Sequence, residues 1–120
     1  MPLVKVEILK GKSTDYKQAI LDGIHSALTE TFQVPPNKRN QRLYELDKED
    51  FQFPSDKSDQ YTLIQLTVIT GRSPETKEKL YRKIVTNLKA SPRIEEHDIT
   101  IAVYELPPEN WKIFYLGESK

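Results

Sequence analysis

The stretch Ile8-Leu9-Lys10-Gly11-Lys12-Ser13 returns sixty residues later as Val68-Ile69-Thr70-Gly71-Arg72-Ser73. At the same offset, Tyr44-Glu45-Leu46 returns as Tyr104-Glu105-Leu106. Because this offset is half of the 120-residue chain, the sequence predicts two copies of one structural unit. A solenoid usually needs at least about three units, so two copies indicate packing about a pseudo-two-fold axis.

The first copy has the pattern of a strand, a helix and a second strand. Apolar and charged residues alternate over residues 3–9, as in a strand with one buried face. After a glycine, Ser13 or Thr14 is placed to cap a helix whose apolar residues recur at helical spacing. We expect this helix to end at about Phe32, before a proline-rich stop, and residues 41–46 to form the second strand.

The second copy repeats this order. Residues 61–69 have the pattern of a strand, Ser73 is placed as a helix cap with Pro74 at the first helical position, and residues 98–106 form the last strand. A right-handed crossover in each copy puts both helices on the same side of the sheet. We therefore predict an α+β fold in which duplicated βαβ units form a four-stranded mixed sheet with two helices on one face.

We expect one domain over residues 1–120, with copies at about 1–46 and 61–106. The linker, residues 47–60, is polar apart from two phenylalanines and fits a plain connecting loop better than a flap over a site. The aromatic tail, residues 107–120, has to dock either on the sheet of its own chain or on a neighbouring subunit. The sheet face left bare by the helices favours the neighbour, and with it an oligomer.

Composition narrows the class of partner. Eighteen basic and eighteen acidic side chains balance, which argues against a nucleic-acid or anionic-membrane binder and leaves small molecules or proteins. The absence of cysteine excludes disulfides, thiolate metal sites and thiol nucleophiles. Neither a secretion signal nor an apolar run of ~18 residues is visible, which is compatible with a cytoplasmic protein and predicts no membrane span.

The clearest difference between the copies is at their start, where Pro2 corresponds to Thr62. If Met1 is removed, Pro2 offers a secondary amine at the chain terminus, the one position in which proline can act as a base. An α-amino group titrates near ~7.7 to 8.0, and desolvation or a nearby cation lowers that value by disfavouring the ammonium form. Such an amine can take a proton next to a carbonyl and return it elsewhere. The structural alternative is a proline that merely starts a strand, and with Met1 retained the Pro2 nitrogen is an amide and not a base.

The second candidate element is Gly71-Arg72-Ser73. A glycine lets a ligand approach the backbone, an arginine binds carboxylates bidentately, and a capped helix N-terminus favours an anion. The alternative is an ordinary strand-to-helix turn with a solvated cation, which is the interpretation we favour for Lys12, its counterpart in the first copy.

These residues carry a family resemblance. Pro2 followed by Ile8-Leu9-x-Gly11-Lys12-Ser13-x-Asp15-x-Lys17, with Gly71-Arg72-Ser73-x-Glu75-x-Lys77 in the second copy, resembles the 4-oxalocrotonate tautomerase superfamily over nearly the whole chain. Members have a single βαβ unit assembled as a hexamer or a fused double unit assembled as a trimer. The duplicated chain is similar to the fused kind, which implies a homotrimer.

The Asn110-Trp111 to Phe114 tail and the Val34-Pro35 to Arg39 to Gln41 spacing further resemble the malonate semialdehyde decarboxylase branch. In that family the terminal proline is the catalytic base or acid, arginines hold the substrate carboxylate, and tail aromatics wall the site. The resemblance therefore implies catalytic roles for Pro2 and Arg72. It implies substrate-binding roles for four further residues: Arg39, Lys38, Trp111 and Phe114.

Two departures from that branch concern the reaction. Lys38 stands where the branch has an aspartate, and Thr70 where it has an additional arginine. Both argue against decarboxylation of a 3-oxo acid, because Lys38 cannot replace a carboxylate, although its charge can help to hold an anion or to depress the pKa of the proline.

The sequence thus predicts a tautomerase-type enzyme in which an N-terminal proline transfers a proton on a small 2-oxo or enol carboxylic acid, with hydration or decarboxylation as further possibilities. The alternative is a non-enzymatic βαββαβ module that binds a metabolite or regulates. His25, beside the apolar stripe of the first helix, and His97, before the last strand, have no second ligand at metal-binding spacing. We expect no metal and no other cofactor.

Overall fold

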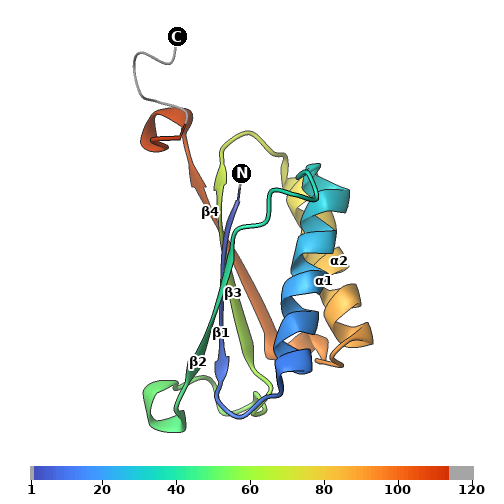
Figure 1. Cartoon of the computed structure of the whole chain (residues 1–120), viewed down its shortest axis with the longest axis vertical. Helices are drawn as coiled ribbons and strands as arrows, with labels where there is room; N and C mark the ends of the chain where they lie inside the picture. Colours follow the sequence, from blue (N-terminus) through green and yellow to red (C-terminus); the bar gives the residue numbers. More distant parts are fainter. Residues whose placement is uncertain (1, 114–120) are drawn as a thin grey trace.

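The computed structural model of the protein describes residues 2–113, and its elements follow the predicted order (Figure 1). Four strands and two α-helices make up the body of the chain: β1 (Leu3–Leu9), α1 (Thr14–Phe32), β2 (Gln41–Leu46), β3 (Thr62–Ile69), α2 (Pro74–Ala90) and β4 (Ile99–Leu106). Three short 3-10 turns lie between or after them: η1 (Lys48–Asp50), η2 (Glu96–Asp98) and η3 (Pro108–Asn110). The sequence predicts the bounds of β1 and β2 correctly, and β3 and β4 each begin one residue later than expected.

The sheet has the strand order β2-β1-β3-β4. Within each copy the two strands are parallel, whereas β1 and β3 run antiparallel, with Val6 opposite Ile64. Both helices cover the same face of this sheet (Figure 1). The predicted α+β class and the duplicated βαβ plan are confirmed.

The core lies between the sheet and the helices. Repeat-related apolar residues are almost fully buried in both copies: Ile20, Ile24, Leu28, Val34, Leu80, Ile84, Leu88 and Ile94. The helices touch at Gly23, where an added Cβ would meet Leu88 Cδ2 at 3.0 Å and where Asn87 donates a hydrogen bond to the Gly23 carbonyl. Both helices begin as predicted, since the Ser13 and Ser73 hydroxyls accept hydrogen bonds from backbone amides in their first turns. No helix within residues 2–113 is long and apolar enough to cross a membrane.

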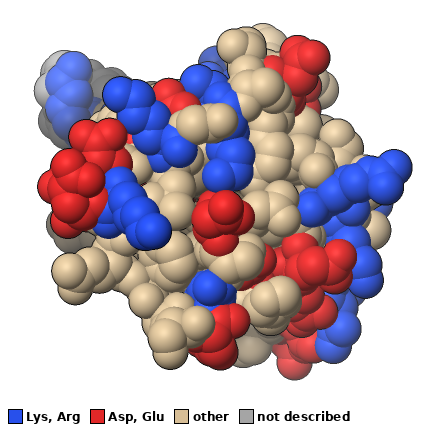
Figure 2. Space-filling model, turned by 90° about the horizontal axis from the view of Figure 1, so that it is seen from below, with Lys and Arg blue, Asp and Glu red and all other residues tan. Residues whose placement is uncertain are grey.

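The linker packs at the end of the sheet opposite to the N-terminus (Figure 1). The rings of Phe51 and Phe53 gather around Tyr61, with centroids 5.1 to 5.8 Å apart. The buried carboxylate of Asp98 accepts hydrogen bonds from the backbone amide and the hydroxyl of Ser58. Figure 2, which looks at this end of the molecule, shows basic and acidic side chains intermixed. The linker is therefore a packed connection and does not cover the end of the sheet where the chain begins.

Asp98 provides a test of this packing. Burial alone would raise the pKa of its carboxyl, but the hydrogen bonds from Ser58, aided by His97 and Lys57, hold the pKa below its usual value. Because the folded-state pKa lies below that of the unfolded chain, the stabilisation is present above pH ~4 and is lost as the pH falls through the folded-state value. We expect Asp98→Asn to reduce the free energy of unfolding by about 1 to 3 kcal/mol at neutral pH.

Urea unfolding at a series of pH values measures this contribution. The difference between wild type and Asp98→Asn should shrink as the pH drops below ~4. A difference that is independent of pH would contradict the assignment of Asp98 as the charged anchor of the linker.

The part of the tail that the structure describes docks on its own chain. Trp111 is 8% exposed, and its indole Nε1 donates a hydrogen bond to the Leu106 carbonyl at 3.2 Å. Trp111 therefore packs on its own chain, next to the end of β4. Phe114 lies outside the described residues.

Candidate active site

Antiparallel pairing of β1 with β3 brings the start of the chain to the end of β3. Leu3 lies opposite Thr67, and the Val4 amide donates a 3.0 Å hydrogen bond to the carbonyl of Asn40, the residue before β2. Pro2, the turn after β3 and the segment 33–40 after α1 therefore share one end of the molecule, at the top of Figure 1. At Gly71 the turn has φ +130°, in the region that favours glycine, and this allows the chain to leave β3 sharply at Arg72.

A pocket of about 250 Å³ opens at this end. Its walls are contributed by the end of α1, the segment after it, the turn after β3 and the tail: Phe32, Gln33, Val34, Pro35, Lys38, Arg72 and Ile113. Most of these walls are apolar, two are cationic, and none of the described ones is a carboxylate. A larger and more open groove of about 490 Å³ follows the crossing of α1 and α2, but its described walls include no lysine or arginine. A third groove, of about 480 Å³, has Lys79, Arg82 and Lys83 among its walls, but it also contains the Glu30 carboxylate, which pairs with Lys83. The smaller pocket, with two cations and no described carboxylate, suits a small organic anion.

Arg72 is held in place by the last residue of α1. Its guanidinium carbon lies 4.2 Å from the centroid of the Phe32 ring, and Nη2 donates a 3.3 Å hydrogen bond to the Phe32 carbonyl. Burial lowers the pKa of Arg72, an effect that the Glu105 carboxylate opposes. The guanidinium stays cationic at neutral pH, because its ordinary pKa is far higher. A guanidinium carries several N–H donors, so the bond to Phe32 leaves others for an anion in the pocket.

Lys38 and Arg39 are neighbours in sequence, but only Lys38 lies at the pocket. Lys38 follows a turn in which its amide donates to the Pro35 carbonyl at 3.0 Å, and its side chain lines the pocket. The Arg39 side chain instead forms a 2.8 Å ion pair with Asp22 on α1 and is not one of the described walls. The structure therefore brings Lys38, and not Arg39, together with Arg72.

The remaining sequence-predicted residues lie around the pocket. Pro2 is buried beside the end of β3 but is not one of the described residues that line the pocket. Trp111 anchors the tail, and Ile113, which is 59% exposed, is the tail residue that reaches the pocket wall. Met1 and Phe114 lie outside the described residues.

Sequence reasoning missed Phe32 as a site residue, although one signal was available. Phe32 is the last residue of α1, and Pro92 stands at the equivalent position of the second copy. Differences between the copies mark the pocket, and this one identifies the ring that supports Arg72. Ile113 carries no comparable signal, because the tail lies outside the repeat.

The equivalent end of the other copy is filled. Lys12, the counterpart of Arg72, is half-buried rather than solvated and donates a 3.0 Å hydrogen bond to the Asp59 carbonyl in the linker. Its ammonium also lies 5.7 Å from the centroid of the Tyr16 ring. The copies thus differ where it matters for chemistry, since one end carries a cationic pocket near the chain terminus and the other is packed with the linker.

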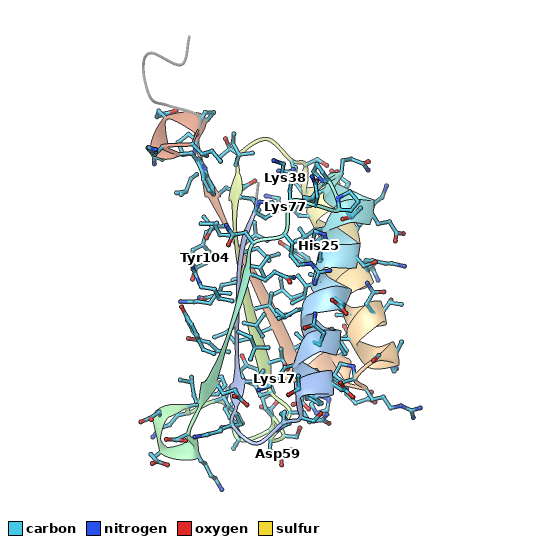
Figure 3. All side chains as sticks on the ribbon, in the orientation of Figure 1. Lys17, His25, Lys38, Asp59, Lys77 and Tyr104 are labelled. Atoms are coloured by element: carbon cyan, nitrogen blue, oxygen red, sulfur yellow. The ribbon has the colours of Figure 1, made fainter. Side chains whose placement is uncertain are left out.

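One ion pair is common to both copies. Lys17 pairs with Glu45 at 3.1 Å and Lys77 with Glu105 at 3.2 Å, and Figure 3 shows the two lysines at opposite ends of the molecule. The two glutamates therefore form structural ion pairs. Within residues 2–113 no group of three or more histidine, aspartate or glutamate side chains is placed to hold a metal ion.

Comparison with known proteins gives the family of this fold and pocket. A family model described as tautomerase enzyme matches residues 38–113, and a second model with the same description matches residues 2–58. The chain belongs to the tautomerase enzyme family. The two overlapping matches together cover both copies, and the chain is an isomerase whose fold is similar to that of a fused 4-oxalocrotonate tautomerase.

Three similar proteins illustrate this tautomerase. The probable tautomerase YrdN of Bacillus subtilis (strain 168) is 26% identical, over 100% of this chain and 95% of its own length. FG41 malonate semialdehyde decarboxylase, solved when inhibited by 3-bromopropiolate, is 27% identical with a TM-score of 0.85, over 96% of this chain and 90% of that one. A wild-type fused 4-OT, solved as a symmetric trimer, is 21% identical with a TM-score of 0.78, over 89% of this chain and 87% of that one.

Proposed function

We propose that this tautomerase converts the enol form of a small 2-oxo carboxylic acid into the keto form, with the Pro2 amine as the proton carrier and Arg72 as the carboxylate anchor. The observation that carries the proposal is the cationic, otherwise mostly apolar pocket beside the start of β1. An anion of a few carbon atoms fits its volume of about 250 Å³. The proposal requires removal of Met1, because only then is the Pro2 nitrogen an amine.

The chemical step needs no cofactor in this scheme. The neutral Pro2 amine accepts the enol hydroxyl proton, and the oxygen electron pair forms the C=O bond. The electron pair of the C=C bond then takes a proton at carbon from the Pro2 ammonium, which restores the neutral amine. Arg72 holds the carboxylate and stabilises the negative charge that develops on the enolate. The burial of Pro2 disfavours a charged ammonium and so favours the form that accepts a proton.

The experiment that tests this function follows loss of the enol absorbance of a simple 2-hydroxyenoate with untagged protein. Labelling with 3-bromopropiolate locates the reacting group in the same sample, because an amine adds to an alkyne conjugated to a carboxylate. We expect catalysed ketonisation and an adduct on the N-terminal peptide at Pro2. Absence of turnover in protein shown by mass spectrometry to lack Met1 would overturn the proposal.

Lys38 contributes a second positive charge to substrate binding. We expect Lys38→Ala to raise KM for the enol acid roughly three- to tenfold with little change in kcat, because a charged contact to the bound anion is lost. Steady-state kinetics measure both parameters. Arg39→Ala is the informative comparison, since Arg39 is the second arginine suggested by the sequence but is paired with Asp22. A larger effect on KM from Arg39→Ala than from Lys38→Ala would contradict the assignment of Lys38.

We further propose that the chain forms a homotrimer, the assembly of the similar fused 4-OT. The sheet face opposite to the helices supports this, because Tyr104 on the edge strand β4 is 50% exposed there (Figure 3). Tyr44, on the edge strand β2 at the other side of the sheet, is 43% exposed. Light scattering on the eluting peak should give three times the chain mass of 14.0 kDa. A monomer at micromolar concentration would contradict the trimer.

A further inference from the structure

The segment 33–40 supplies much of the pocket wall, and α1 holds it through polar contacts. His25 Nε2 lies 2.9 Å from the Pro36 carbonyl oxygen, and its side chain is buried, with 7% exposed. Gln41 donates a 2.7 Å hydrogen bond to the Leu21 carbonyl just beyond the segment. Pro36 lies between the pocket residues Pro35 and Lys38. The His25 contact therefore holds the middle of the turn that carries both of them.

The second copy contains the same turn without a hydrogen bond from a histidine. The Lys38 amide donates to the Pro35 carbonyl at 3.0 Å, and the equivalent Asp98 amide donates to the Glu95 carbonyl at the same distance. The position equivalent to His25 is Val85, whose side chain cannot donate a hydrogen bond. A hydrogen bond from a buried histidine of the helix to this turn is therefore found only in the copy that has the pocket. The repeated fold itself does not require it.

The contact has a defined chemical direction. A carbonyl oxygen can only accept, so His25 Nε2 must carry the hydrogen that is donated to Pro36. Both the Nε2-protonated neutral ring and the imidazolium meet this condition. The Asp22 carboxylate, one turn earlier on α1, is engaged by Arg39, which holds the pKa of Asp22 below its usual value. Because Nε2 carries a hydrogen in both forms of the His25 ring, the hydrogen bond to the turn is retained in either charge state.

We infer that His25 is a positioning residue: by fixing the Pro35–Lys38 turn on α1, it places the Lys38 ammonium at the pocket and so sets the affinity for the carboxylate substrate. Figure 3 shows His25 on α1 and Lys38 in the segment that follows, at the same end of the molecule. The inference rests on the proposed function, since it assigns His25 a role in binding the anion on which that function acts. His25 does not line the pocket, and it acts only through the turn.

Two substitutions separate positioning from general stability. His25→Leu removes the donor, whereas His25→Gln keeps an N–H donor near the Nε2 position. We expect His25→Leu to raise KM for the 2-hydroxyenoate about two- to tenfold, with kcat changed less than about twofold. His25→Gln should recover most of the lost affinity. The inference would be overturned if His25→Leu lowered kcat as strongly as it raised KM. It would also be overturned if His25→Gln recovered none of the lost affinity.

Coupling to Lys38 tests the route of the effect. If His25 acts through the Lys38 ammonium, His25→Leu should change KM little once Lys38→Ala is present. Equal effects of His25→Leu with and without Lys38 would overturn the inference, because the histidine would then act by another path.

Hydrogen exchange measured by mass spectrometry gives a readout that does not depend on turnover. His25→Leu should speed exchange in the peptide that contains the Lys38 amide by about two- to tenfold, and leave the equivalent peptide around Asp98 unchanged. Unchanged exchange at Lys38 would overturn the inference even if the protein is active. If wild type had no enol ketonisation but His25→Leu loosened the turn, the proposed function would fail while the mechanical role of His25 would stand.

Discussion

Pro2→Ala lowers kcat/KM for the 2-hydroxyenoate by about 10²- to 10⁴-fold, the range typical for loss of a positioned acid–base group. The substitution leaves a primary amine at the chain terminus but removes the ring that fixes the direction of its lone pair. Pro2 is buried at the start of β1, so the amine has little freedom to be placed elsewhere. The KM should change far less than kcat, because in this account Pro2 acts on the proton and not on the carboxylate.

The repeat offers a matched control for this prediction. Thr62 stands at the equivalent start of β3, is fully buried, and bonds through its hydroxyl to the Gln60 carbonyl. Thr62→Ala should leave kcat/KM within about threefold of wild type, at a cost in stability of about 1 kcal/mol. Equal losses of activity in Pro2→Ala and Thr62→Ala would show that Pro2 matters for packing and not for catalysis.

Arg72→Ala should lower kcat/KM by about 10²- to 10³-fold, because the guanidinium both binds the substrate carboxylate and stabilises charge in the transition state. Arg72→Lys should lie between wild type and Arg72→Ala, since lysine keeps the charge but cannot form two parallel hydrogen bonds to a carboxylate. Steady-state kinetics on the enol acid measure all three proteins.

Lys12→Ala is the control for Arg72, because Lys12 occupies the same place in the other copy and bonds to the linker. It should leave kcat/KM near the wild-type value. An Arg72→Ala enzyme with wild-type kcat/KM would rule out Arg72 as the carboxylate anchor. A large loss of kcat/KM in Lys12→Ala would show that the active site lies at the end of the molecule where the linker packs.

The fold was predictable because its signals are local. Alternation of apolar and charged residues over 3–9 and the Ser13 and Ser73 caps are visible in short windows of sequence, and the duplication is visible when two such windows sixty residues apart are compared. Each is independent of the other copy's position in space. The strand order, in which the two units meet through antiparallel β1 and β3, was not predicted and comes from the structure.

The site was predictable only in part, because direction and long-range contact are not local. Arg72 was identified from its turn, but its support by Phe32 joins residues forty positions apart. Lys38 and Arg39 look equivalent in sequence, yet one faces the pocket and the other pairs with Asp22. That choice depends on how the segment after α1 lies on the helix, which is set by tertiary contacts such as the one from His25.

Catalysis by the Pro2 amine is tested by comparing the same chain with and without a free amine at Pro2. Protein that retains Met1, made in cells whose methionine aminopeptidase is inhibited, is separated or quantified by intact mass spectrometry and assayed for ketonisation beside the Met1-free form. Turnover should be proportional to the Met1-free fraction. Equal turnover by the two forms would show that the Pro2 nitrogen carries no proton in the reaction.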